Sequence, residues 1–152
     1  MKNLACGCPG SHVRTIEATE TTQPEATGRL ASELRQWPTQ LHLVPPSAPY
    51  LANAHLLIAA DCAPFAYAEF HRDFIKGRVL VNACPKLDDT GPYVEKLAAM
   101  IRNNDIQSIT VTIMEVPCCR GLAMLAQEAL KQSGKDVPLE IAVIGVDGQR
   151  RS

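Results

Sequence analysis

The sequence predicts a single α/β domain: a three-layer, flavodoxin-like or Rossmann-like fold with helices on both faces of a mainly parallel, five-stranded sheet. Two observations predict this class. Apolar, β-branched runs alternate along the chain with segments of helical apolar spacing, a pattern typical of parallel βαβ units. The chain of 152 residues is also long enough to bury one core without disulfides.

Five apolar runs are expected to form the strands: residues 41–44, 55–60, 78–83, 108–114 and 139–146. The expected helices are residues 27–36, 65–75, 93–103 and 121–133, with Gly134 ending the last one. The first helix should stop before Trp37-Pro38, because proline disfavours helical conformation in the residue before it, and should pack Trp37 inward. The link through Pro45-Pro46 is too short and proline-rich for a helix.

Residues 1–26 are expected to form an irregular, cysteine-bearing arm, and residues 27–152 the α/β domain. The net charge is -1 and the cations are scattered, so the sequence predicts no nucleic-acid partner. The amino terminus lacks the apolar region of a secretory signal, and no apolar run approaches the roughly 20 residues that span a bilayer. We therefore predict a cytoplasmic protein with no membrane partner; homo-oligomerisation is left open.

The six cysteines are the main functional clue. In a reducing compartment they predict metal ligands or redox thiols rather than disulfides. Cys62, Cys84 and the pair Cys118-Cys119 each follow a predicted strand. Because parallel strands end on the same side of a sheet, we expect these four thiols to meet in one cavity at its carboxyl edge.

A 4Fe-4S cluster takes four thiolates, and Cys8 of the arm would complete the set. The cofactor site is therefore predicted to contain Cys8, Cys62, Cys84, Cys118 and Cys119. Cys119 is expected to bind metal and Cys118 to lie nearby, because Cys119 is nearer a helix amino terminus, where thiolate is stabilised. Cys6 is expected to be more dispensable.

Other polar residues near the thiols receive simpler interpretations. Asp61 and Glu115 precede cysteines and are expected to cap a helix or to lie exposed at a strand end, although both could face the cluster. Arg120 begins the helix after Cys119, where it would favour thiolate or contact a partner. Only His12 is expected near the site; His42, His55 and His71 are assigned to packing or the surface.

Several stretches carry a family resemblance. The runs LVPPSAPYL, LLIAADCAPFAYAEFH, FIKGRVLVNACPKLDD and ITVTIMEVPCCRGL resemble the carboxyl-terminal domain of bacterial and archaeal ferredoxin-like iron-sulfur proteins. In many of these, a two-cluster ferredoxin segment precedes a Cys-Pro-Gly-Ser stretch similar to residues 8–11. The resemblance, from about Cys6 to Gly148, implies an iron-sulfur protein linked to electron transfer. The ferredoxin cysteine run itself is absent, and Ala83 and Arg120 stand where similar sequences usually have glycine.

Two functional hypotheses follow. The first is a 4Fe-4S protein of electron transfer or redox chemistry, with a ferredoxin or an oxidoreductase as its partner; it assigns no catalytic residue. The second is a thiol or persulfide redox enzyme that uses Cys118-Cys119. This second hypothesis assigns no shared role to Cys8, Cys62 and Cys84. A flavodoxin-like cofactor binder would need a glycine-rich loop after the first strand, and structural zinc usually uses local cysteine knuckles; the sequence has neither.

Overall fold

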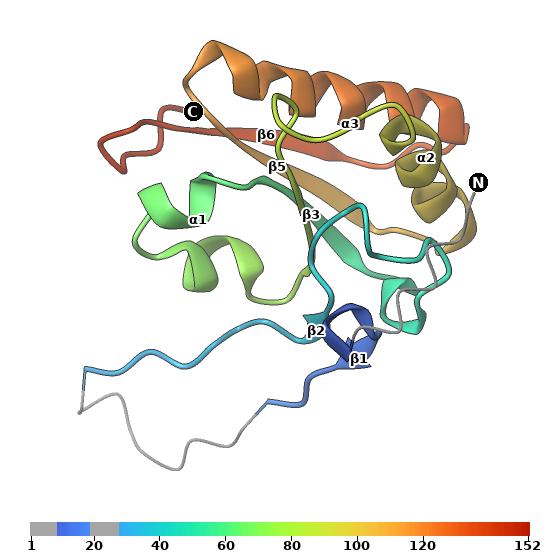
Figure 1. Ribbon diagram of the computed structural model, residues 1–152, viewed down its shortest axis with the longest axis horizontal. Helices are drawn as coiled ribbons and strands as arrows, with labels where there is room; N and C mark the ends of the chain where they lie inside the picture. The colour runs from blue at the N-terminus through green and yellow to red at the C-terminus, as the bar shows by residue number, and fades with distance from the viewer. Residues whose placement is uncertain (1–8, 19–27) are drawn as a thin grey trace.

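The computed structural model describes residues 9–18 and 28–152. Its centre is a parallel sheet of four strands: β3 (His55–Ala60), β4 (Val79–Ala83), β5 (Ser108–Met114) and β6 (Leu139–Ile144). The spatial order is β4-β3-β5-β6 (Figure 1). The predicted α/β class is therefore confirmed, with four strands in this sheet rather than five.

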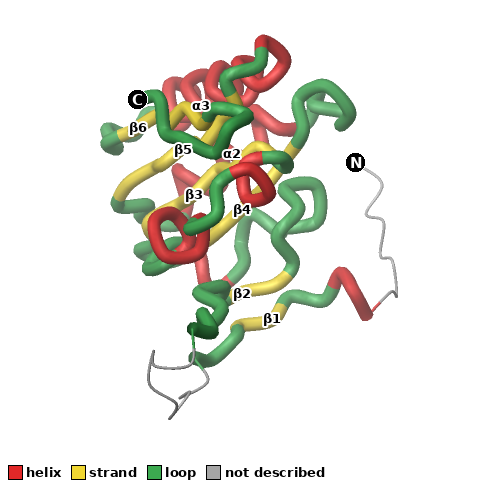
Figure 2. Tube along the Cα trace, turned by 90° about the vertical axis from the view of Figure 1, so that its left-hand side faces the viewer, coloured by secondary structure: helices red, strands yellow, loops and turns green. Residues whose placement is uncertain are grey.

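Helices cover both faces of the sheet. α2 (Tyr93–Asn103) and α3 (Arg120–Ser133) pack against each other on one face, while α1 (Ala63–Ala66) and the single π-helical turn η4 (His71–Ile75) lie on the other (Figures 1 and 2). The strand order explains this. The chain moves outward from β3 to β4, then crosses back over β3 to β5, and right-handed crossovers in opposite directions place their helices on opposite faces.

The core lies between these layers. The two central strands, β3 and β5, are buried along almost their whole length, as expected for parallel strands covered on both faces. α2 contributes Leu97 and Met100 and α3 contributes Leu122 and Ala126, all with no exposed surface. α3 ends at Gly134, whose φ of 70° is left-handed, so the predicted helix end is confirmed.

Residues 41–44 are not a strand, which corrects the predicted first strand. They form turns, in which the N–H groups of Leu43 and Val44 both donate to the carbonyl of Gln40. Gln40 alone makes an isolated parallel bridge to Asn82 of β4. Leu41 and Val44 are buried, so the apolar spacing that resembled a strand serves a turn packed beside the edge of the sheet.

The predicted helix over residues 27–36 is also wrong for the part that the structure describes. Residues 28–35 have no helix, and β2 (Gln36–Trp37) pairs antiparallel with β1 (Arg14–Thr15). Strand alternation buries Gln36 and leaves Trp37 39% exposed, so Trp37 does not pack inward. The Gln36 amide is satisfied because its Nε2 donates to the carbonyl of Leu80 at 2.6 Å.

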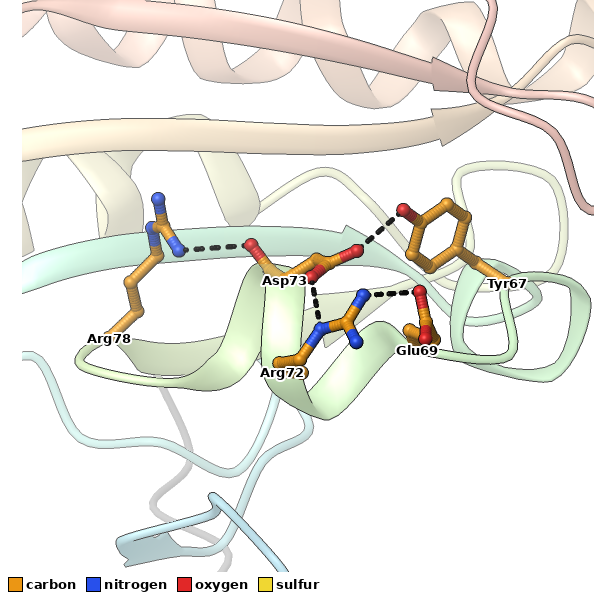
Figure 3. A network of polar contacts seen from close by, with 5 residues as sticks. All are labelled: Tyr67, Glu69, Arg72, Asp73 and Arg78. Carbon is orange, nitrogen blue, oxygen red and sulfur yellow. Dashed lines mark hydrogen bonds and ion pairs between the residues drawn. The ribbon is translucent and has the colours of Figure 1, made fainter. Parts of the chain in front are cut away.

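The predicted helix over residues 65–75 is divided into α1 and η4. Tyr67, between them, has an extended backbone, and its hydroxyl donates a 2.7 Å hydrogen bond to Asp73 of η4. Arg72 joins Asp73 to Glu69 in the same network, and Arg78 donates to the Asp73 carbonyl (Figure 3). Edge-to-face contact between Tyr67 and Phe74 adds to these links. Contacts between side chains therefore stabilise the interruption between α1 and η4.

Short 3-10 turns complete the described chain: η1 (Pro9–Ser11), η3 (Pro49–Leu51) and η5 (Pro117–Cys119). Within residues 9–18 and 28–152, no helix combines the length and the hydropathy that crossing a bilayer requires.

Candidate thiol site at the carboxyl edge of the sheet

Cys62 and Cys84 follow neighbouring strands that end at the same level. β3 and β4 are paired so that Ala60 lies opposite Ala83, their last residues. Cys84 is the next residue after β4, and Cys62 is two residues beyond β3. Both are free thiols; Cys62 is exposed and Cys84 half-buried. The register therefore brings these two predicted site residues to one edge of the sheet.

Asp61 joins the ends of the same two strands. Its backbone N–H donates to the Ala83 carbonyl at 3.1 Å, and its carboxylate accepts a 2.6 Å hydrogen bond from Asn82 Nδ2. Asp61 thus stabilises the turn that carries Cys62; it is half-buried and caps no helix, which differs from the expected helix cap or exposed carboxylate.

Asp88 closes the loop that follows Cys84. The backbone N–H of Asp88 donates to the Cys84 carbonyl at 2.9 Å, and Asp88 Oδ2 accepts from the Cys84 N–H at 3.0 Å. The same oxygen accepts a 2.7 Å hydrogen bond from the hydroxyl of buried Tyr93, the first residue of α2. Burial, and then the Asp88 carboxylate, raise the pKa of Tyr93 far above its ordinary value, so Tyr93 stays a donor.

Cys118 and Cys119 lie in η5, which continues directly into α3. Cys118 is exposed, whereas Cys119 is only 7% exposed. Burial raises the pKa of Cys119; a hydrogen bond with the backbone of Met114 opposes this, and the Cys118 and Cys62 thiols raise it further. The thiolate-stabilising effect that favoured Cys119 in the sequence is thus outweighed by desolvation.

A glycine allows the Cys84 loop to approach the vicinal cysteines. A Cβ atom on Gly121, in the first turn of α3, would lie 3.2 Å from Cβ of Pro85, which is closer than most such contacts. Pro85 follows Cys84, and Gly121 follows Cys119 by two residues. The loops after β4 and β5 therefore meet across the end of β3.

Glu115, which lies three residues before Cys118, binds the chain that follows β6. Its Oε2 accepts from the Val146 N–H at 3.2 Å and lies 3.3 Å from Arg151, which also pairs with Asp147. Glu115 therefore serves a structural contact rather than pointing freely toward the thiols.

Not every predicted site residue can be placed. Cys6 and Cys8 lie outside the described residues, so the contribution of the arm stays a prediction. His12 is exposed and near the described start of the arm, where Gly10 accepts a hydrogen bond from Trp37. His55 bonds Ser108 where β3 and β5 begin, and His71 accepts from the Glu33 N–H, both away from the thiols.

The donor atoms at this edge of the sheet decide which kind of metal centre it could hold. Among the residues that the structure describes, no three Cys, His, Asp or Glu side chains stand close enough to hold a single ion. A 4Fe-4S cluster asks for a different arrangement, because each of its four thiolates binds its own iron atom. A set of free cysteines at the ends of β3, β4 and β5 fits that requirement better than a one-ion zinc site.

The fold family follows from comparison with known proteins. Residues 48–150, which include the whole four-stranded sheet, match the model of a Rossmann-like domain. The chain belongs to the Rossmann-like domain family. A protein of Archaeoglobus fulgidus, described only as an uncharacterized protein, is 33% identical over 116 residues, covering 76% of this chain and 81% of that protein. No solved structure matches the chain.

The topology of this Rossmann-like domain singles out one crevice. Ligands in open α/β sheets bind beyond the carboxyl ends of the strands where the strand order reverses, here between β3 and β5. That is the position of Cys62 and Cys118-Cys119. The loop after β3, Asp61-Cys62-Ala63-Pro64, contains no glycine, so it lacks the glycine-rich phosphate-binding turn of dinucleotide sites and has Cys62 at this position.

Sequence reasoning missed the link from Cys84 through Asp88 to Tyr93. The only signal was the spacing of Asp88 four residues after Cys84, which suits a closed loop but is common in ordinary turns.

Proposed function

We propose that this protein binds one 4Fe-4S cluster at the carboxyl edge of its sheet and acts in electron transfer or redox chemistry. The proposed ligands are Cys8, Cys62, Cys84 and Cys119, with Cys118 beside them. The observation that supports the proposal is the position of four free thiols just after three adjacent parallel strands, at the edge of the sheet where its switch point lies.

The residues of the chain would hold the cluster in distinct ways. The cluster would supply a one-electron centre. Cys62 and Cys84 are fixed by the Asp61 and Asp88 hydrogen bonds, so the two loops need little rearrangement to present their thiols. Metal binding displaces the proton of a ligating thiol, which would offset the raised pKa of buried Cys119.

A thiol or persulfide redox enzyme is the second candidate. It is favoured by one observation: exposed Cys118 interacts with Cys119 directly, so the pair has one accessible and one sheltered sulfur. Against it, the raised pKa of Cys119 makes that sulfur a weak nucleophile at neutral pH. This candidate also leaves Cys62 and Cys84 unused.

Anaerobic purification followed by iron, zinc and acid-labile sulfide analysis tests the proposal. We expect about four iron and four sulfide per chain, and a broad absorption in the visible blue region. Cys62→Ser and Cys84→Ser should each lower the iron content, whereas Cys6→Ser, the matched control from the arm, should retain it. Stoichiometric zinc, or thiol chemistry by metal-free protein that needs Cys118, would overturn the proposal. The proposal also includes a cytoplasmic location and a redox protein as the partner.

A further inference from the structure

The chain that follows β6 folds back as a tight turn at the edge of the sheet that carries the thiols. We define the β6 turn as residues 145–151. Within it, the Gly145 N–H donates to the Gln149 carbonyl at 2.8 Å. The Arg151 N–H then donates to the Val143 carbonyl at 2.7 Å, which returns the chain to β6. In Figure 1 this turn lies on the left-hand side, as α1 does, so it is placed to contact the segments that carry cysteines.

Arg151 joins the β6 turn to the segment that leads to the vicinal cysteines. Its Nη2 lies 3.3 Å from Glu115 Oε2 and 2.9 Å from Asp147 Oδ2. The space that a Cβ atom on Gly145 would need is filled by the Glu115 carboxylate and the Arg151 guanidinium. Glu115 is the residue directly after β5, and η5 begins two residues later. The turn therefore binds the chain just before it reaches Cys118.

Gly148 joins the same turn to the helix that begins after Cys62. Its φ is 83°, and a Cβ atom on it would lie 2.7 Å from the backbone oxygen of Ala66, closer than real Cβ atoms approach. Ala66 is the last residue of α1, and its N–H donates to the Cys62 carbonyl at 3.2 Å. Because α1 has only four residues, a displacement of Ala66 would reach Cys62.

Arg150 attaches the β6 turn to the fold independently of these two contacts. Its guanidinium carbon lies 5.8 Å from the centre of the Phe74 ring in η4, and its Nη2 pairs with Glu140 of β6. The turn should therefore stay in place when either Gly148 or Arg151 is replaced.

We propose that the β6 turn sets the position of Cys118-Cys119 relative to Cys62, with Gly148 and Arg151 as its positioning residues. These thiols follow β5 and β3, neighbouring strands at the point where the strand order reverses. One turn bound to both segments holds them at a fixed separation. A cubane needs a fixed separation, because its iron atoms stand at the corners of a rigid body. That use of the turn rests on the proposed function, whereas its effect on the thiols does not.

Cys84 is the internal reference for this proposal. Its loop is closed by Asp88, which accepts from the Cys84 N–H at 3.0 Å and donates to the Cys84 carbonyl at 2.9 Å. No described residue of the β6 turn takes part in these hydrogen bonds. A change in the turn should therefore alter the other thiols and spare Cys84.

The first test measures how fast each cysteine of the full chain is alkylated by iodoacetamide, a small neutral reagent, with peptide mass spectrometry as the readout. The thiols are kept reduced, and bound metal is first removed by chelation. Cys119 is only 7% exposed, and release of Glu115 should let η5 open. Arg151→Ala should therefore raise the alkylation rate at Cys119 at least about threefold relative to Cys84. Arg151→Lys, which keeps a cation for the carboxylates, should restore most of the wild-type ratio.

Arg35→Ala is the matched control for the loss of an ion pair. Arg35 also pairs with a carboxylate, that of Glu33, and its side chain is 38% exposed against 45% for Arg151. It lies just before β2, outside the segments that carry the thiols, so its loss should leave the ratio of Cys119 to Cys84 unchanged. Equal acceleration by both alanine variants, acceleration of every cysteine alike, or no recovery with Arg151→Lys would overturn the role of Arg151.

Gly148→Ala tests the contact with α1. The added Cβ should displace the Ala66 carbonyl, so amide hydrogen exchange in the peptide that contains α1 should accelerate at least about threefold. Gly77→Ala is the matched control: Gly77 also has a positive φ, 77°, but a Cβ atom on it would have nothing within 4 Å. The two variants carry similar backbone strain, so only the contact with Ala66 distinguishes them. Equal exchange of α1 in both would overturn the role of Gly148.

Iron analysis of the same preparations separates this proposal from the proposed function. In iron-containing protein, Arg151→Ala should also shift the reduction potential, and Arg151→Lys should restore it. Iron-free protein in which Arg151→Ala accelerates alkylation of Cys119 would support the role of the β6 turn and remove the cluster. Iron-containing protein in which Cys119 and α1 respond no more than in the controls would overturn the role of the turn and leave the cluster in place.

Discussion

The backbone N–H of Cys84 donates a 3.0 Å hydrogen bond to the carboxylate of Asp88, four residues further along the chain. Asp88 returns a hydrogen bond from its own N–H to the Cys84 carbonyl. The loop after β4 is therefore closed at both ends, and these hydrogen bonds fix the backbone position of Cys84.

Replacing Asp88 should destabilise the domain. Asp88→Ala removes the acceptor of the Tyr93 hydroxyl, which belongs to a side chain only 2% exposed, and of the Cys84 N–H. We expect a loss of about 1–3 kcal/mol in the free energy of unfolding, measured by urea denaturation, because a buried donor is left unsatisfied. Asp89→Ala, which removes an exposed neighbour, should change it by less than about 0.5 kcal/mol. Equal effects of the two changes would contradict the role given to Asp88.

The Asp73 network predicts an acid-sensitive contribution to stability. The hydrogen bond from Arg72, and then that from Tyr67, lower the pKa of Asp73 below its ordinary value (Figure 3). A depressed folded pKa stabilises the fold above the unfolded pKa of about 3.9, and this contribution is lost as the pH falls through the folded pKa. The stability difference between the wild type and Asp73→Asn should thus be constant from neutral pH to about pH 5 and shrink below about pH 4, as followed by urea denaturation. A difference that persists unchanged at the lowest pH would argue against ionised Asp73.

The elements that could be predicted from sequence are those whose signals are local. The bounds of β3, α2 and β5 match the predicted residues, because long apolar periods and β-branched runs decide them. Residues 41–44 were misassigned because four residues are too few to distinguish a strand from a turn with two buried side chains. The prediction of a helix before Trp37 was wrong for a related reason. The hydrogen bond of Gln36 with Leu80, a tertiary contact, outweighs the helical spacing of the apolar residues in this segment.

The same distinction between what sequence can and cannot predict applies to the candidate site. The gathering of Cys62, Cys84 and Cys118-Cys119 at one edge could be derived from topology, because parallel strands end together. The burial of Cys119 and exposure of Cys118 could not be derived, because strand alternation stops at Glu115 and the η5 turn sets the direction of each side chain.

Gln36 should stabilise the attachment of β2, and of β1 that pairs with it, to the four-stranded sheet. Its amide nitrogen donates to the Leu80 carbonyl at 2.6 Å, and its amide oxygen accepts from the Leu80 N–H at 3.4 Å, so one side chain pairs with edge strand β4. Gln36→Ala should lower the free energy of unfolding by about 1–3 kcal/mol. Hydrogen exchange at Leu80 should accelerate as well. Gln107→Ala removes an exposed amide and is the control; loss of protection in both variants would refute a specific role for Gln36.

Cys118 and Cys119 should respond differently to replacement. If Cys119 completes the ligand set with Cys8, Cys62 and Cys84, no iron is left for Cys118, because a cubane accepts one protein thiolate per iron. Cys119→Ser should therefore lose most of its iron, whereas Cys118→Ser should keep the cluster at an altered reduction potential, measured by iron analysis and redox titration. Because Cys119 is buried, Cys119→Ala serves as a second variant: it should lose iron while its metal-free form stays folded, which shows that the loss comes from the missing thiolate. Iron lost only from Cys118→Ser would reverse the assignment and give the ligand role to the exposed sulfur. Complete loss from both serine variants would mean that both sulfurs coordinate metal, and that the cluster is not an ordinary four-cysteine cubane.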